Sequence, residues 1–119
     1  MTKYRNKKLT TPDGPFDSQR EYKRWCELKL LEKAGVIQDL RRQVDYVLLP
    51  RRKRDDGTFE RAVKYKADFV YLERWQEVAG DGTFIWSAVV EDSKGMKTDV
   101  WILKRKMMLH FHGISVRET

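Results

Sequence analysis

Cysteine and long apolar runs are nearly absent from this chain of 119 residues. The single cysteine, Cys26, excludes both a disulfide framework and a cysteine-based zinc site. No apolar stretch approaches the roughly 20 residues that a membrane helix needs. Residues 1–8 are basic and lack the apolar run of a signal peptide. These absences predict a cytoplasmic protein that stays reduced and has no membrane partner.

Positive charge is abundant instead. The chain has 25 Lys and Arg against 18 Asp and Glu, which gives a net charge of +7. This excess favours a polyanionic partner, and nucleic acid is the first candidate, although many small proteins are simply basic. Lys97 and Lys104 are seven positions apart, and we predict that both face DNA from one side of a helix. Four consecutive cations are predicted to contact phosphates from a hairpin tip, with a solvated loop as the alternative: Arg51, Arg52, Lys53 and Arg54.

The length fits one domain with one core. Residues 1–15 are predicted to be a flexible basic arm, and residues 16–119 a single domain. Hydrophobic periodicity and capping signals predict the elements in the order αβββαβ, at residues 18–34, 44–49, 61–78, 83–94, 98–113 and 114–116. This order predicts an α/β (α+β) fold in which helices flank a mixed central sheet.

Charged residues interrupt two strands that are otherwise apolar. Asp68 lies in the second predicted strand, and Glu91, Asp92 and Lys94 end the third. Such charges are costly on a buried strand unless they are paired or bind a metal. Alternation places Asp92 and Lys94 on one face and Glu91 on the other. A three-residue loop at 80–82 would set Asp68 opposite Lys94, whereas a two-residue turn would bring Glu91 to the face of Asp68.

We favour the set of Asp68, Asp92 and Lys94, which suits phosphodiester cleavage. Two carboxylates and the backbone carbonyl of Ser93 can hold Mg²⁺ (or Mn²⁺), which keeps several of its waters. The metal would activate a water and neutralise developing charge. Lys94 would orient that water or stabilise the transition state. The alternative is a structural ion pair across the strands between Lys94 and Asp68.

Three short motifs give the chain a family resemblance. FDS-x-x-E stands at residues 16–21, DFVY at 68–71 and VVEDxKG at 89–95. Together they resemble the PD-(D/E)xK nuclease superfamily, which includes restriction endonucleases and Holliday-junction resolvases, and more closely its small phage-encoded members. The resemblance covers about residues 16–117. One departure is that Ala67, not proline, precedes Asp68.

The resemblance implies metal-dependent hydrolysis, with Asp68 and Asp92 as ligands and Lys94 as the catalytic lysine. Glu21 would complete the site, although a capping box with Ser18 explains Glu21 equally well. The implied activity is that of a deoxyribonuclease, an endonuclease acting on branched or recombination-intermediate DNA in a bacterial host. A homodimer would cut two strands symmetrically. The alternatives are a DNA-binding module that does not cut and an adaptor in a replication complex.

Overall fold

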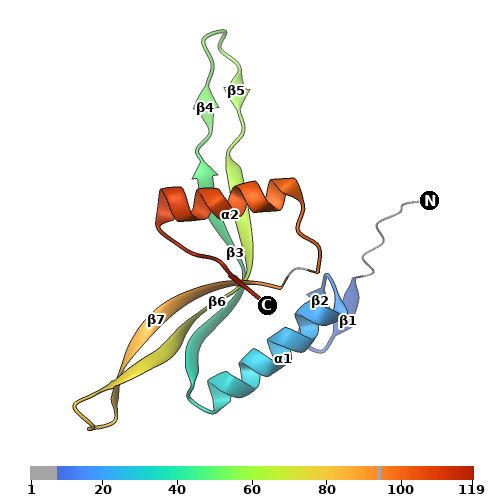
Figure 1. Cartoon of the computed structure of the whole chain (residues 1–119). Coiled ribbons are helices and arrows are strands. Elements are labelled where there is room, and N and C mark those ends of the chain that lie inside the picture. Colours follow the sequence, from blue (N-terminus) through green and yellow to red (C-terminus); the bar gives the residue numbers. More distant parts are fainter. Residues whose placement is uncertain (1–7, 94) are drawn as a thin grey trace.

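The computed structural model describes residues 8–93 and 95–119. The chain forms two helices and eight strands (Figure 1), which run in the order β1 Leu9–Thr11, β2 Gly14–Phe16, α1 Gln19–Lys33, β3 Ile37–Leu49, β4 Arg52–Lys53, β5 Phe59–Glu60, β6 Val63–Val78, β7 Thr83–Asp92, α2 Asp99–His112 and β8 Arg117–Glu118. The central sheet has the strand order β3-β6-β7-β8. Its first three strands pair antiparallel, and β8 pairs parallel with β7.

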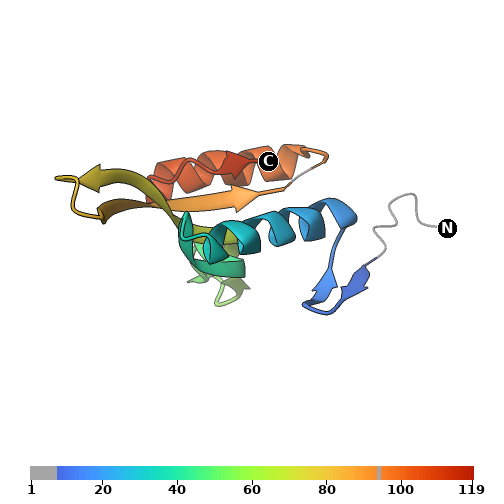
Figure 2. The ribbon, with the colours of Figure 1, turned by 90° about the horizontal axis from the view of Figure 1, so that it is seen from below.

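The predicted αβββαβ order and the mixed sheet are therefore confirmed, because α1, β3, β6, β7, α2 and β8 form the core. The two helices cover opposite faces of the sheet (Figure 2). The cluster under α2 contains Leu48, Tyr65, Ala67, Val70, Val90, Trp101 and Met108. The cluster under α1 contains Leu28, Ile37, Phe69, Tyr71 and Val89. Burial on both faces explains why β6 and β7 carry near-continuous apolar runs.

Side-chain caps set the predicted helix starts. The Ser18 hydroxyl accepts a hydrogen bond from the backbone N–H of Glu21 at 3.1 Å, and α1 begins at the next residue after Ser18. Thr98 caps α2 in the same way, through the N–H of Trp101 at 3.1 Å. Gly113 ends α2 in the left-handed conformation (φ 66°), which glycine adopts without a Cβ clash. No helix in residues 8–93 and 95–119 is long and apolar enough to cross a membrane.

Three predicted boundaries were wrong. Residues 9–16 form a β1–β2 hairpin, where the end of a flexible arm was predicted; residues 1–7 lie outside the described part of the chain. The first core strand begins at Ile37 rather than residue 44, because its first half is polar and irregular, with positive φ at Asp39 and Gln43. The last strand is Arg117–Glu118 rather than residues 114–116.

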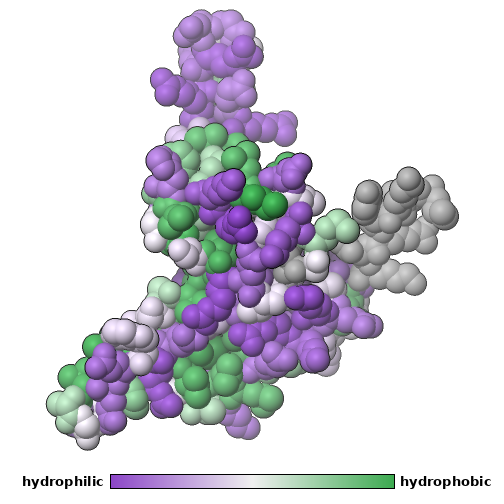
Figure 3. All heavy atoms as spheres, in the orientation of Figure 1, coloured by the Kyte–Doolittle hydropathy of each residue, from purple (hydrophilic) through white to green (hydrophobic). Residues whose placement is uncertain are grey.

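Two hairpins project beyond the helices (Figure 1). One continues from β3 through β4 and β5 into β6, and Figure 3 shows hydrophilic residues covering it. The other is the distal part of β6 and β7, which carries exposed apolar side chains such as Trp75 and Ile85. Neither hairpin is covered by a helix (Figure 1).

Candidate active site

The pairing of β6 with β7 brings Asp68 and Asp92 together. Phe69 pairs with Glu91 and Val70 with Val90. Continuing this register by one residue sets Asp68 opposite Asp92. The prediction that Asp68 lies opposite Lys94 was therefore wrong by two positions.

Two separate irregularities cause this shift. The hairpin loop spans four residues, 79–82, because Val78 pairs with Thr83. The register also slips by one between Arg74 and Gln76, which leaves a bulge at Trp75. Each change alone would turn Asp68 to the other face of the sheet, but together they restore it.

Asp92 is fully buried and firmly oriented. Its Oδ2 accepts a hydrogen bond from the Tyr65 hydroxyl at 2.6 Å and another from the indole N–H of Trp101 at 2.7 Å. Tyr65 comes from β6 and Trp101 from the first turn of α2, so both strand and helix fix this carboxylate. Neither Tyr65 nor Trp101 was predicted to belong to the site. The available signal was that a buried Tyr or Trp needs a partner for its polar group.

Asp68 faces the same buried end of the sheet. Its Oδ2 accepts a hydrogen bond from the backbone N–H of Ser93 at 2.9 Å, so Ser93 lies at the site where a third ligand was predicted. Burial, followed by the hydrogen bond and the charge of Asp92, raises the pKa of Asp68 to about 8. Two carboxyl groups this close resist ionising together, which favours the protonated form of Asp68.

This pair fits a hard divalent cation. Mg²⁺ commonly binds one or two carboxylates and keeps several waters. A bound cation would offset the repulsion between the two carboxylates, which adds to the effect of burial on the pKa of Asp68. Asp68 and Asp92 are the residues that would hold it. Among residues 8–93 and 95–119, no three Asp, Glu, His or Cys side chains are grouped closely enough to form a larger metal cluster.

Glu21 is buried near this pair. Its backbone N–H makes the capping bond to Ser18, while its charge is among the causes that raise the pKa of Asp68. Its Oε1 accepts a hydrogen bond from the Gln43 amide at 2.8 Å. Gln43 has a φ of 53°, a conformation that is uncommon for a residue with a side chain. Glu21 is thus close to Asp68, and its carboxylate is already bound by protein.

The predicted basic residues lie in different places. Lys94 lies outside the described residues. Lys97 forms an ion pair with Glu118, and it precedes the cap of α2. It therefore lies just before the second helix, while Lys104 lies within it. The four cations of residues 51–54 are exposed on the β4–β5 hairpin, where the Arg51 guanidinium stacks 3.8 Å from the ring centre of Phe59.

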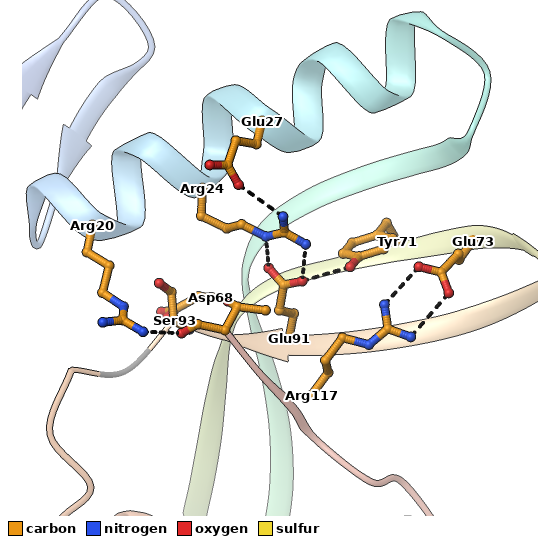
Figure 4. Close-up of polar contacts among 10 residues, drawn as sticks. Arg20, Arg24, Glu27, Asp68, Tyr71, Glu73, Glu91, Ser93 and Arg117 are labelled. Carbon is orange, nitrogen blue, oxygen red and sulfur yellow. Dashed lines mark hydrogen bonds and ion pairs between the residues drawn. The ribbon is translucent and has the colours of Figure 1, made fainter.

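Glu91 points away from the pair, toward α1 (Figure 4). It is fully buried and accepts two hydrogen bonds from Arg24, each 2.9 Å, and one from the Tyr71 hydroxyl at 2.7 Å. Arg24 was not predicted as this partner. A signal was present, because a charge on the second face of a buried strand requires a counter-charge from the covering helix.

The raised pKa of Asp68 predicts a pH-dependent stability. The ordinary pKa is 3.8, and the folded value is about 8. Between these values the folded protein keeps a proton that the unfolded chain has lost, so the free energy of unfolding should fall as pH rises through this window. Urea denaturation in EDTA at pH 5, 6.5 and 8 would measure it. Asp68→Asn should flatten the profile; an equally steep profile in this variant would assign the effect elsewhere.

Comparison with protein families gives a match over nearly the whole chain. Residues 1–117 match the model of a family described as "Protein of unknown function (DUF1064)". No curated protein and no solved structure matches the chain.

Proposed function

Because the chain belongs to the DUF1064 family, whose description states no activity, we propose from the site itself that the protein is a metal-dependent deoxyribonuclease. The observation that carries the proposal is the buried pair of Asp68 and Asp92. Ordinary strands avoid two opposed carboxyl groups, because like charges directly opposite destabilise a sheet. A pair fixed in this way is well suited to binding a divalent cation.

The residues of the site would have three roles: binding the metal, positioning a ligand and stabilising the transition state. Asp68 and Asp92 would hold Mg²⁺ or Mn²⁺, and Tyr65 and Trp101 keep Asp92 in position. When bound, the metal supplies an activated water and neutralises charge on the phosphate. Lys94, two positions after Asp92 in the sequence, is proposed to stabilise the transition state. This division matches the resemblance to PD-(D/E)xK nucleases.

The surface supports DNA as the substrate. The chain has a net charge of +7, and the β4–β5 hairpin, which projects beyond the helices (Figure 1), exposes the four cations of residues 51–54. Such a hairpin could hold a duplex beside the cut through its phosphates. A branched or recombination-intermediate substrate in a bacterial cytoplasm, cut by a homodimer, fits these features.

The exposed surface of α2 supports a protein partner. Its apolar residues Val100, Leu103 and Phe111 are exposed and could contact a second protein chain.

Cleavage of a DNA panel tests the proposal. Labelled linear, nicked, flap and four-way-junction DNA would be incubated with the protein in Mg²⁺, Mn²⁺ or EDTA. We expect cutting in either metal, none in EDTA, and the highest rate on a branched substrate. Binding without cutting in both metals would favour the DNA-binding module. Neither binding nor cutting would favour the replication adaptor.

A further inference from the structure

Two consecutive residues of β3 reach the same carboxylate on α1. The Gln43 amide donates a hydrogen bond to Oε1 of Glu21 at 2.8 Å, and a guanidinium nitrogen of Arg42 lies 3.9 Å from the same oxygen. Neighbouring side chains of a regular strand point to opposite faces of the sheet. The left-handed φ of 53° at Gln43 interrupts this alternation and lets both side chains face Glu21.

Gln43 also lies next to the carboxylate pair. The pairing of β3 with β6 stays in register on both sides of Gln43, and it sets this residue opposite Asp68. Asp68 in turn lies opposite Asp92 on β7. A row of three polar residues therefore crosses three neighbouring strands, and the hydrogen bond from Gln43 extends the row to Glu21 on the covering helix.

Glu21 is a third buried carboxylate at this end of the sheet. Burial, followed by the charge of Asp17, raises the pKa of Glu21; the charge of Arg42 and hydrogen bonds from the Asp17 backbone and from Gln43 act in the opposite direction. The charged form of Glu21 is therefore costly unless positive charge is near. A cation held by Asp68 and Asp92 would supply it.

The backbone of Gln43 departs from what a strand residue prefers. A positive φ is uncommon for a residue with a side chain, and it costs free energy that the surrounding structure must offset. Glycine would adopt the same conformation without that cost. Because the unusual φ directs the amide to Glu21, beside the candidate site, the strained conformation is accounted for by the hydrogen bond that it creates.

We infer that Gln43 is a positioning residue, which holds the carboxylate of Glu21 so that it accepts a hydrogen bond from a water of the cation bound by Asp68 and Asp92. Glu21 would contact a water rather than the cation itself, because within residues 8–93 and 95–119 no three acidic, His or Cys side chains are grouped as direct ligands. Mg²⁺ keeps several of its waters, and groups around the direct ligands strongly influence metal affinity. This inference rests on the proposed function for its cation.

Manganese binding in the absence of DNA tests this role. Mn²⁺ would be titrated into the protein and followed by electron paramagnetic resonance, with Asp92→Asn showing which binding belongs to the pair. Gln43→Gly removes the amide and suits the positive φ, so it should fold and yet weaken Mn²⁺ binding by about tenfold. Asp39→Gly is the matched control, because Asp39 is an exposed residue of β3 with a φ of 57°. Its affinity should stay within about twofold of wild type.

A double-mutant cycle determines whether Gln43 acts through Glu21. Glu21→Gln keeps the shape of the side chain and removes its charge, so it should weaken Mn²⁺ binding by a similar factor. In that background Gln43→Gly should change the affinity by no more than about twofold, because the carboxylate that it positions is gone. Fully additive losses would overturn the inference, and so would a Gln43→Gly protein that binds Mn²⁺ like Asp39→Gly.

The nuclease proposal has a separate readout. If the two losses are coupled but the wild-type protein cuts no DNA, the role of Gln43 stands and the nuclease proposal fails. If cutting depends on Asp92 while Gln43→Gly keeps the wild-type affinity for Mn²⁺, the inference fails and the nuclease proposal stands. A wild-type protein without any Mn²⁺ binding that Asp92→Asn removes would overturn the inference.

Discussion

Asp92→Asn should lower the rate of metal-dependent DNA cutting by at least about a thousandfold, which corresponds to roughly 4 kcal/mol of transition-state stabilisation. The amide has the shape of the carboxylate and can still accept hydrogen bonds from Tyr65 and Trp101. The change therefore removes the charge that holds the cation while preserving the packing. DNA binding should be retained or become tighter, because a negative charge near the strand is lost.

Glu91→Gln provides a matched control for this experiment. It is the same kind of substitution at the neighbouring residue, but Glu91 faces α1 and contacts Arg24. Cutting rates under single-turnover conditions and anisotropy in EDTA would be measured for both variants, after circular dichroism has verified folding. We expect Glu91→Gln to cut and Asp92→Asn not to. An Asp92→Asn protein that cuts at the wild-type rate would show that the site lies elsewhere.

Arg24→Met should cost about 3–5 kcal/mol of the free energy of unfolding. The substitution leaves Glu91 fully buried without its positive partner, and the remaining Tyr71 hydroxyl cannot offset a whole charge. The loss comes from the stranded charge rather than from lost packing, because methionine retains most of the apolar stem of arginine. Urea denaturation followed by circular dichroism would measure this change.

Two further variants test that explanation. Arg24→Met combined with Glu91→Gln should recover a large share of the loss, since glutamine carries no charge and still accepts the bond from Tyr71. Lys23→Met changes an exposed neighbour on the same helix and should stay within about 0.5 kcal/mol of wild type. A loss under about 1 kcal/mol in Arg24→Met would mean that Glu91 finds another partner or a proton.

The sequence predicted the elements that carry local signals. Ser18, Thr98 and Gly113 have fixed roles at helix ends, so both helices were predicted within about one residue of their observed bounds. The first half of β3 was missed because it is polar and lies on an edge strand, where hydrophobic alternation is weak. Its positive-φ residue Gln43, which binds Glu21, leaves no recognisable pattern in the sequence.

In the candidate site too, some residues carry a signal in the sequence and others do not. Asp68 and Asp92 could be chosen because charge is unusual in apolar strands, whereas their shared face depended on the register of the hairpin. Their direct pairing could not be predicted, because it depends on a bulge at Trp75 that has no proline or glycine to mark it. The partners Tyr65, Trp101 and Arg24 depend on tertiary packing, which periodicity does not specify.

The bulge and the four-residue loop also restrict how this hairpin can change in length. Deleting a single residue from positions 79–82 would rotate the inner half of β6 against β7 and separate Asp68 from Asp92, unless Trp75 re-entered the ladder at the same time. Length variants that keep the carboxylate pair should therefore differ by an even number of residues, or change the loop and the bulge together. Far from the core, the exposed tip thus determines which insertions and deletions the buried site can tolerate.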